Sequence, residues 1–224
     1  MPAWDSSIQG AYPPAVIFDT NDEISFGALK RFAGIILTEG VPQAYSEFPL
    51  AFEFARGKAA QILGIHPKQI SLIGSARIGY SLNPERFGNV FDAALSDIDL
   101  LAISDLLFGL LAAEHTRFIN AWAAGTIQPK HNIQRGFWES SRDRDPLNIE
   151  RGFLDSNHIP TLDLFPVAQR FGEAAYKFHI NLEKLSGRNV GKRASIRIYR
   201  DWDSAMNQIV GSLKGALRRR RDAR

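Results

Sequence analysis

The sequence predicts an α+β fold in which a small mixed β-sheet of three to four strands is flanked by helices. Long segments whose apolar residues recur every three or four positions indicate amphipathic helices. Short apolar runs bounded by turn residues indicate strands. These elements follow one another in the order helix, helix, strand, strand, helix, helix, strand, helix. Because strands and helices are intermixed and no internal repeat is visible, we expect a single domain over residues 1–224.

Composition narrows the function classes. The chain has 224 residues, of which 45% are hydrophobic and 23% charged, so it can bury a sizeable core. It has no cysteine, which excludes disulfides and cysteine-based zinc sites. No stretch approaches the roughly 20 apolar residues of a membrane span, and the start lacks the pattern of a secretion signal. We therefore expect a cytoplasmic protein without a membrane partner.

The net charge of +3 is unevenly distributed along the chain. Residues 1–112 hold 7 Lys and Arg against 12 Asp and Glu, whereas residues 113–224 hold 20 against 12. An acidic half and a basic half suit a protein that gathers cations on one side and phosphate-bearing partners on the other. Solvated helix faces produce the same imbalance, so charge alone leaves the partner open.

The N-terminal part, residues 1–66, is predicted to be helical. Polar residues at 19–22 can cap a first helix over residues 24–37, where apolar side chains keep a helical spacing. A second helix is predicted from about residue 42 to residue 63, and Gly64 ends it.

The next part, residues 67–124, contains two predicted strands. Residues 70–73 are apolar and β-branched, as in a buried strand, and residues 97–103 form a second strand beside it. The polar, glycine-containing stretch 76–96 between them is too irregular for regular secondary structure. Residues 105–124 have the apolar spacing of a helix.

The remaining chain is divided by composition. Residues 125–160 are polar and charged, and they are predicted to form a flexible connection. Residues 161–224 are predicted to form a helix, a strand and a helix with a basic end. The expected boundaries are 162–185 for the helix, 194–200 for the strand, and 203 to the arginines at 218–221 for the last helix.

Two motifs at the predicted strands carry chemistry. Asp97 and Asp99 are two positions apart, so their carboxylates lie on one face of a strand and repel each other unless a cation separates them. Mg²⁺ or Mn²⁺ would supply that charge and prefers oxygen ligands. Gly74 lets the backbone approach a ligand, and Ser75 offers a hydroxyl and an N–H, with Arg77 close by. Together these residues predict a pocket for a triphosphate and a metal ion.

Each motif alone also fits a turn or a strand end, so the combination matters more than either one. The five histidines lack metal-ligand spacing and are expected to be surface or packing residues. Tyr199 and Trp202 are expected in the core rather than stacked on a base. The arginines at 218–221 fit either a solvated helix end or a contact with nucleic acid.

The motifs resemble the DNA polymerase beta-like nucleotidyltransferase superfamily, whose signature is a Gly-Ser turn followed by an acidic-x-acidic pair on the next strand. Residues 74–84, 87–88 and 96–100 are also similar to small bacterial members of this superfamily associated with phage-defence loci. The resemblance covers about residues 40–105, with a weaker part at 198–202. It implies a nucleotidyltransferase-like fold and a metal-dependent transfer of a nucleoside monophosphate from a nucleoside triphosphate to a hydroxyl acceptor.

The resemblance also implies roles for individual residues. Gly74 and Ser75 would bind the triphosphate, aided by Arg77, while Asp97 and Asp99 would hold Mg²⁺ or Mn²⁺. Ser75 and the two aspartates would be the catalytic residues. Two metal ions would activate the attacking hydroxyl and stabilise the leaving pyrophosphate. The acceptor stays open, with nucleic acid, protein, a second nucleotide and a small molecule as candidates.

The interval between the two motifs is longer than in the superfamily pattern. Asp97 follows Ser75 by 22 positions, so residues 81–96 are predicted to fold over the site as a lid. Phe87 and Phe91 are the expected anchors of this lid, because aromatic side chains can order an otherwise mobile loop.

A third carboxylate, which the superfamily places on a later strand, is not evident. The predicted strand at 194–200 offers Ser195 and Arg197 on one face, and Asp163 and Asp201 are the remaining candidates. This gap favours an alternative, a catalytically degenerate protein of the same fold that binds nucleotide or nucleic acid without transfer. Arg197 supports the alternative because a cation there would compete with a second metal ion.

Overall fold

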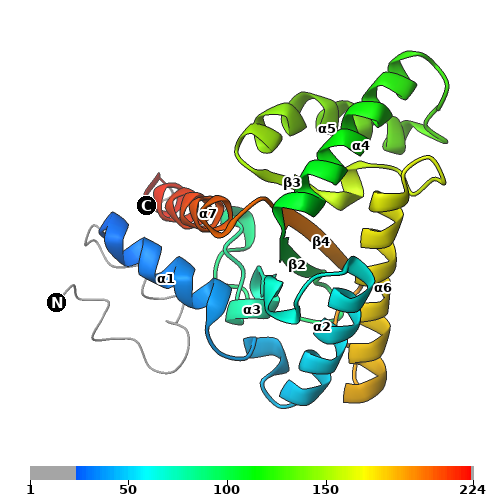
Figure 1. Ribbon diagram of the computed structural model, residues 1–224. Coiled ribbons are helices and arrows are strands. Elements are labelled where there is room, and N and C mark those ends of the chain that lie inside the picture. Colours follow the sequence, from blue (N-terminus) through cyan, green and yellow to red (C-terminus); the bar gives the residue numbers. More distant parts are fainter. Residues whose placement is uncertain (1–23, 223–224) are drawn as a thin grey trace.

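The computed structural model describes residues 24–222, and of residue 84 and residues 219–222 only the backbone. In this part of the chain seven α-helices flank a four-stranded mixed sheet, which confirms the predicted α+β class (Figure 1). The predicted caps at residues 19–22 lie outside the described residues.

The sheet brings four strand ends together. Its order is β1-β2-β4-β3, in which β1 runs antiparallel to β2, β2 parallel to β4, and β4 antiparallel to β3. The strands are β1 (Ile70–Ile73), β2 (Ile98–Ile103), β3 (Phe153–Asp155) and β4 (Ala194–Tyr199). The C-terminal ends of β1 and β3 therefore meet the N-terminal ends of β2 and β4 at the same end of the sheet. There Asp99 pairs with Ile73 on one side and with Ser195 on the other.

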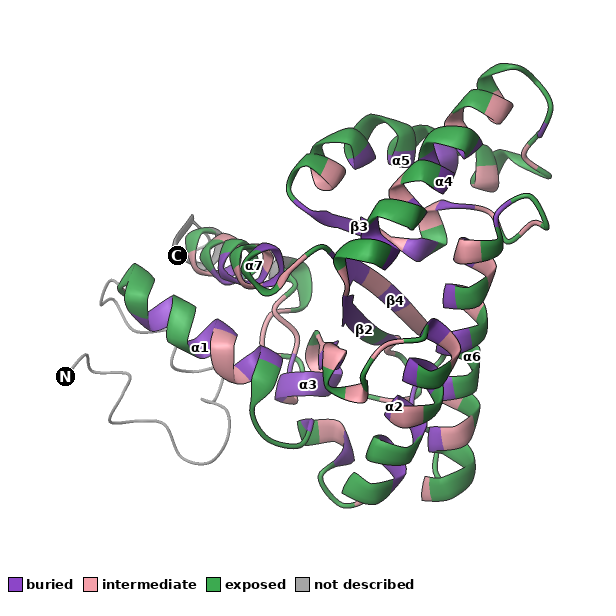
Figure 2. Cartoon of the chain, in the orientation of Figure 1, coloured by how far each residue is buried: buried purple, intermediate pink, exposed green. Residues whose placement is uncertain are grey.

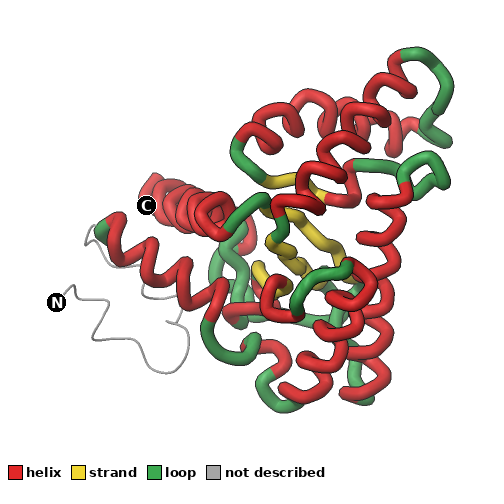
Figure 3. The backbone as a smooth tube through the Cα atoms, viewed as in Figure 1, coloured by secondary structure: helices red, strands yellow, loops and turns green. Residues whose placement is uncertain are grey.

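Helices cover both faces of the sheet (Figure 3). One face packs against α2 (Pro49–Leu63), α4 (Asp105–Ala123) and α6 (Pro166–Ser186), and the other against α1 (Phe26–Thr38) and α7 (Trp202–Asp222). Alternate strand residues divide between two cores, so Leu100 belongs to the first and Leu101 to the second. Figure 2 shows the strands buried between helices whose outer faces are exposed.

Proline positions explain why two helices begin later than predicted. α2 begins at Pro49 and α6 at Pro166, in both cases several residues after the expected start. Proline suits the first turn of a helix and keeps the preceding residue out of the helical conformation, as at Phe48 (φ −138°, ψ 59°). The residues before α2 instead form the short 3₁₀-helix Gln43–Tyr45. The other predicted helices and strands agree with the structure to within two residues.

Residues 76–96, which were predicted to lack regular structure, contain two short helical turns. The helix α3 (Ser75–Ile78) makes one turn directly after Gly74, and Pro84–Arg86 forms a 3₁₀-helix. An isolated bridge joins Tyr80 to Val90 and closes the stretch into a loop.

The largest correction concerns residues 125–160, which are not a connection without regular structure. They contain α5 (Asn132–Glu150), the edge strand β3 and the 3₁₀-helix Ser156–His158. The buried residues of α5 are Trp138, Ser141 and Asp145, so two of the three are polar. The segment consequently lacks the apolar periodicity by which a buried helix is recognised in a sequence.

Asp145 lies at the centre of a buried polar network that holds α5 in place. Its side chain is completely buried; His115 Nε2 of α4 lies 3.0 Å from its Oδ2, and His158 Nδ1 lies 2.8 Å from its Oδ1. Burial alone would raise the pKa of Asp145, but hydrogen bonding with the two histidines lowers it to about 2. His115 and His158 therefore have a structural role as the partners of Asp145.

Within residues 24–222, no helix combines the length and the apolar character needed to cross a membrane.

Candidate functional site

The Gly74–Ser75 turn lies directly against Asp99. Gly74 leaves β1 with φ 71° and ψ −160°, a conformation that residues with a side chain avoid. A Cβ atom at this position would lie 3.0 Å from Asp99 Oδ2. Glycine is thus required both by the turn and by the close approach of the two strands. The two motifs, far apart in the sequence, meet at this point.

Asp99 is held in place but is not neutralised by its nearest partner. Its Oδ1 accepts a hydrogen bond from the Ser195 hydroxyl at 3.3 Å, and its side chain reaches solvent. Desolvation by the surrounding protein raises the pKa of Asp99, although Arg197 and Ser195 oppose this effect. A bound cation would favour the ionised carboxylate, so Asp99 is suited to act as a metal ligand.

Asp97, just before β2, has a partner that can be displaced. Arg193 Nε donates to Asp97 Oδ2 at 3.1 Å, and the Arg193 side chain is 75% exposed. The two lie side by side because the backbone N–H of Ile98 donates to the Arg193 carbonyl, which extends the β2–β4 pairing. An exposed ion pair of this kind contributes at most about 1 kcal/mol. A divalent cation could therefore replace Arg193 on Asp97.

Two adjoining cavities meet at Ser75 and Asp99. The first, of about 520 Å³, is lined mainly by polar and charged residues that include Arg86, Asp92, Asp97, Lys192 and Arg193. The second, of about 510 Å³, lies between β1, β4 and α7 and combines apolar residues such as Ile73 and Ile209 with Arg197, Tyr199 and Gln208. Ser75, Ser81, Asn83 and Asp99 line both. Four of the predicted site residues, Gly74, Ser75, Asp97 and Asp99, are thus brought together.

The segment 81–96 lies against this site, as predicted for a lid. Ser81 and Asn83 line both cavities, and several later residues of the segment line the first one. Phe87 packs on the core beneath α1 and α7, and Phe91 packs on the core of the opposite face. Both expected aromatic anchors are therefore in place; opening and closing of the segment stay a prediction.

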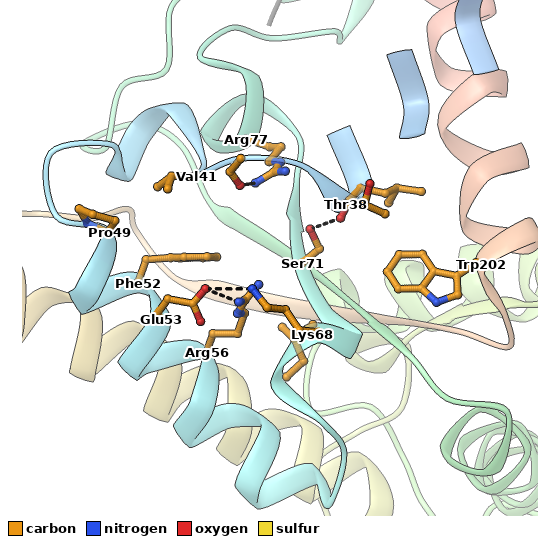
Figure 4. A pocket seen from close by; sticks show the side chains of 13 residues that line it. Thr38, Val41, Pro49, Phe52, Glu53, Arg56, Lys68, Ser71, Arg77 and Trp202 are labelled. Atoms are coloured by element: carbon orange, nitrogen blue, oxygen red, sulfur yellow. Dashed lines mark hydrogen bonds and ion pairs between the residues drawn. The ribbon is translucent and has the colours of Figure 1, made fainter. Parts of the chain in front are cut away.

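Arg77 has a structural position instead of the predicted contact with nucleotide. Its buried guanidinium donates from Nε to the Ile36 carbonyl at 2.6 Å and from Nη1 to the Gly40 carbonyl at 3.0 Å. Ile36 is in the last turn of α1, where the carbonyls have no partners within the helix, and Gly40 lies two residues after the helix ends. Arg77 lines a third cavity, of about 420 Å³, which shares no lining residue with the two at Asp99 (Figure 4). The prediction for Arg77 is corrected accordingly.

Neither predicted candidate for a third carboxylate reaches the site. Asp163 accepts a hydrogen bond from Gln169 near the start of α6, and Asp201 caps α7 by accepting from the Ser204 N–H at 2.7 Å. Neither lines the two cavities at Asp99. The carboxylate that lies nearest in the sheet is Asp155, which was missed because β3 was not predicted.

Three cations of the first cavity were also missed. Lys192 and Arg193 directly precede β4, and Arg86 lies in the inserted segment. The basic residues between 188 and 193 were visible in the sequence as a signal before a predicted strand. Their position beside Asp97 depends on the parallel pairing of β2 and β4, which the sequence does not reveal.

The residues present fit one divalent cation. Asp97 and Asp99 provide carboxylates in one cavity, Ser75 provides a hydroxyl, and Mg²⁺ commonly takes one or two carboxylates together with phosphate oxygens of the substrate. On β4, the residue opposite Asp99 is Ser195, and the next residue on the same face is Arg197. A second divalent cation would need a third carboxylate, and β4 has none on this face.

Comparison with known proteins gives no assignment, because no protein-family model, no curated protein and no solved structure matches the chain. The chemistry of the site is therefore inferred from its own residues. They comprise a glycine turn against an acidic pair, cations around a polar cavity, and a half-apolar cavity beside it.

Proposed function

We propose that this chain is a metal-dependent nucleotidyltransferase, which binds a nucleoside triphosphate with Mg²⁺ or Mn²⁺ and moves the nucleoside monophosphate to a hydroxyl acceptor. The observation that carries the proposal is the contact of the Gly74 turn with Asp99 at the junction of two cavities. The resemblance of both motifs to the polymerase beta-like superfamily supports it. A cytoplasmic location and a role in phage defence belong to the same proposal through that resemblance.

The residues divide the work of binding between them. Ser75 and the glycine backbone before it would contact phosphate oxygens, and Lys192 and Arg193 would pair with the remaining phosphate charge. Asp97 and Asp99 would hold the cation, which neutralises and orients the phosphates when it is bound. The acceptor oxygen would form a bond to the α-phosphorus, its proton would pass to solvent water, and the bond from the α-phosphorus to pyrophosphate would break. Such chemistry depends on positioning far more than on a covalent intermediate.

The direct test is a transfer assay with each labelled nucleoside triphosphate, Mg²⁺ or Mn²⁺, and nucleic-acid, protein, nucleotide and small-molecule acceptors. Transfer is expected with at least one combination and should be abolished by Asp99→Asn. Asp143→Asn is the matched control, because Asp143 is 68% exposed on α5 and lies outside the two cavities. Absence of transfer in every combination, or transfer that persists in Asp99→Asn, would contradict the proposal.

A second candidate is binding of nucleotide without transfer. It is favoured by Ser195 and Arg197, which stand on the face where a third carboxylate is needed for efficient removal of the acceptor proton. Calorimetry with a nucleoside triphosphate and Mg²⁺, combined with an assay for released pyrophosphate, separates the two. Binding without release supports this candidate, and release supports transfer. A nucleic-acid-binding module would instead bind DNA or RNA with steep salt dependence, unchanged by Asp99→Asn.

A further inference from the structure

We propose, on the basis of the proposed function, that Arg197 provides a fixed positive charge in this site in place of a second divalent cation, so that the site holds one metal ion. The superfamily that the motifs resemble uses two. The difference follows from the residues that this chain carries on β4 and β3.

Arg197 belongs to the same cavity as the acidic motif. It lies on β4 two residues after Ser195, which pairs with Asp99, so all three side chains are on the sheet face covered by α1 and α7. Arg197 and Asp99 both line the 510 Å³ cavity, which Ser75 also lines. The guanidinium is therefore inside the site where the triphosphate is expected.

The partners of Arg197 fix its position. Asp155, directly opposite on β3, places Oδ2 3.6 Å from Arg197 Nη2, and the Phe153 ring lies 5.9 Å from the guanidinium carbon. The other oxygen of Asp155 accepts a hydrogen bond from the Asn157 N–H at 3.1 Å. Both oxygens of Asp155 thus have a partner, and a metal ion would have to compete with Arg197 for this acid.

The two arginines beside the acids differ in how easily they are displaced. Arg193 is 75% exposed and pairs with Asp97 at the surface, whereas Arg197 is 33% exposed and contacts Asp155 and Phe153 of β3. A metal ion can replace Arg193, but it would have to displace Arg197 from a pair that the sheet holds together. A guanidinium can also bind two phosphate oxygens at once, which a second metal ion would otherwise do.

The test counts Mn²⁺ ions bound per chain, measured from the free Mn²⁺ signal in electron paramagnetic resonance without nucleotide. Wild type should bind one equivalent. Arg197→Gln should bind two, because Asp99 and Asp155 would be left on one face without a cation between their strands. Arg197→Met is a second variant that keeps an unbranched side chain against Phe153 and should also bind two. Arg193→Gln is the matched control, which should still bind one equivalent and bind it more tightly.

The outcomes separate this inference from the proposed function. Two equivalents in wild type, or one equivalent in an Arg197 variant whose melting curve shows a folded protein, would overturn the inference and leave the nucleotidyltransferase proposal standing. No Mn²⁺ binding by wild type, either alone or with a nucleoside triphosphate present, would overturn both. If neither Arg197 variant folds, the stoichiometry of wild type still decides between one ion and two.

Discussion

Asp99 and Asp145 are both aspartates whose pKa the surrounding protein shifts, but the two shifts are in opposite directions. Asp145 is completely buried, lies against two histidines, and has a pKa lowered to about 2. Asp99 reaches solvent through a cavity, has one hydrogen bond from a neutral hydroxyl, and has a raised pKa. The first charge is satisfied within the fold and stabilises it. The charge of Asp99 is opposed by Arg197 and Ser195 but faces a cavity, which is the arrangement expected of a binding site.

The largest effect is expected from Asp145→Asn. This change removes the buried carboxylate charge that His115 and His158 both contact, so the free energy of unfolding should fall by about 3–5 kcal/mol. Urea denaturation followed by circular dichroism measures it. Asp143→Asn, two positions earlier on the exposed side of α5, should change stability by no more than about 0.5 kcal/mol. A loss below about 1 kcal/mol for Asp145→Asn would remove the contrast with Asp99.

The same network gives stability a defined pH dependence. The folded pKa of Asp145, about 2, lies below the value of about 3.9 for an unfolded chain. Its contribution is therefore complete above about pH 4 and is lost as the pH falls toward 2. The difference in stability between wild type and Asp145→Asn should shrink across this interval, and a constant difference would argue against the lowered pKa.

An intermediate effect is expected from Gly74→Ala. The added Cβ would lie 3.0 Å from Asp99 Oδ2, in a backbone conformation that alanine adopts poorly, so stability should fall by about 1–3 kcal/mol. Gly57→Ala is the matched control, because Gly57 lies within α2 with nothing within 4 Å of the added atom. It should leave stability unchanged or raise it by up to about 1 kcal/mol. Equal effects at the two glycines would break the claim that the turn and the acid are in contact.

The smallest effect on stability, and one of opposite sign, is expected from Asp99→Asn. The raised pKa means that the ionised carboxylate is disfavoured in the folded protein. In chelator the variant should therefore melt at the wild-type temperature or slightly above it, and its free energy of unfolding should be higher by less than about 1 kcal/mol. Wild type should gain stability with added Mg²⁺ by mass action, and the variant should gain nothing. Thermal melts with and without Mg²⁺ measure both. If Asp99→Asn melts below wild type in chelator and Mg²⁺ has no effect on wild type, Asp99 is a structural acid like Asp145.

The parts of the fold that could be predicted from the sequence are those whose residue pattern lies within one short segment. The strand at 70–73 is a continuous apolar run, and Gly74 and Ser75 follow it directly, so the strand and the turn were both recognised. The acidic pair at the start of β2 was recognised for the same reason.

The parts that could not be predicted depend on contacts between distant segments. α5 buries Asp145, whose partners His115 and His158 lie on α4 and after β3, so the buried face of this helix cannot be recognised without the fold. Arg77 stands beside the Gly-Ser turn in sequence, yet its long side chain ends at the carbonyls of α1. Asp155 becomes relevant only because β3 pairs with β4. The Gly-Ser turn and the acidic pair could therefore be found from the sequence. The charged residues around them depend on the order of the strands in the sheet.

The short stretch from Asp155 to His158 joins the two regions. Asp155 holds Arg197 at the cavity, His158 closes the network around Asp145, and between them the Ser156 hydroxyl donates to the Ile196 carbonyl of β4 at 2.7 Å. One turn of backbone consequently carries both Asp155, the partner of Arg197, and His158, a partner of Asp145 on α5. Because one turn carries both contacts, we expect hydrogen exchange at β3 to rise when either the pair of Asp155 with Arg197 or the pair of His158 with Asp145 is removed.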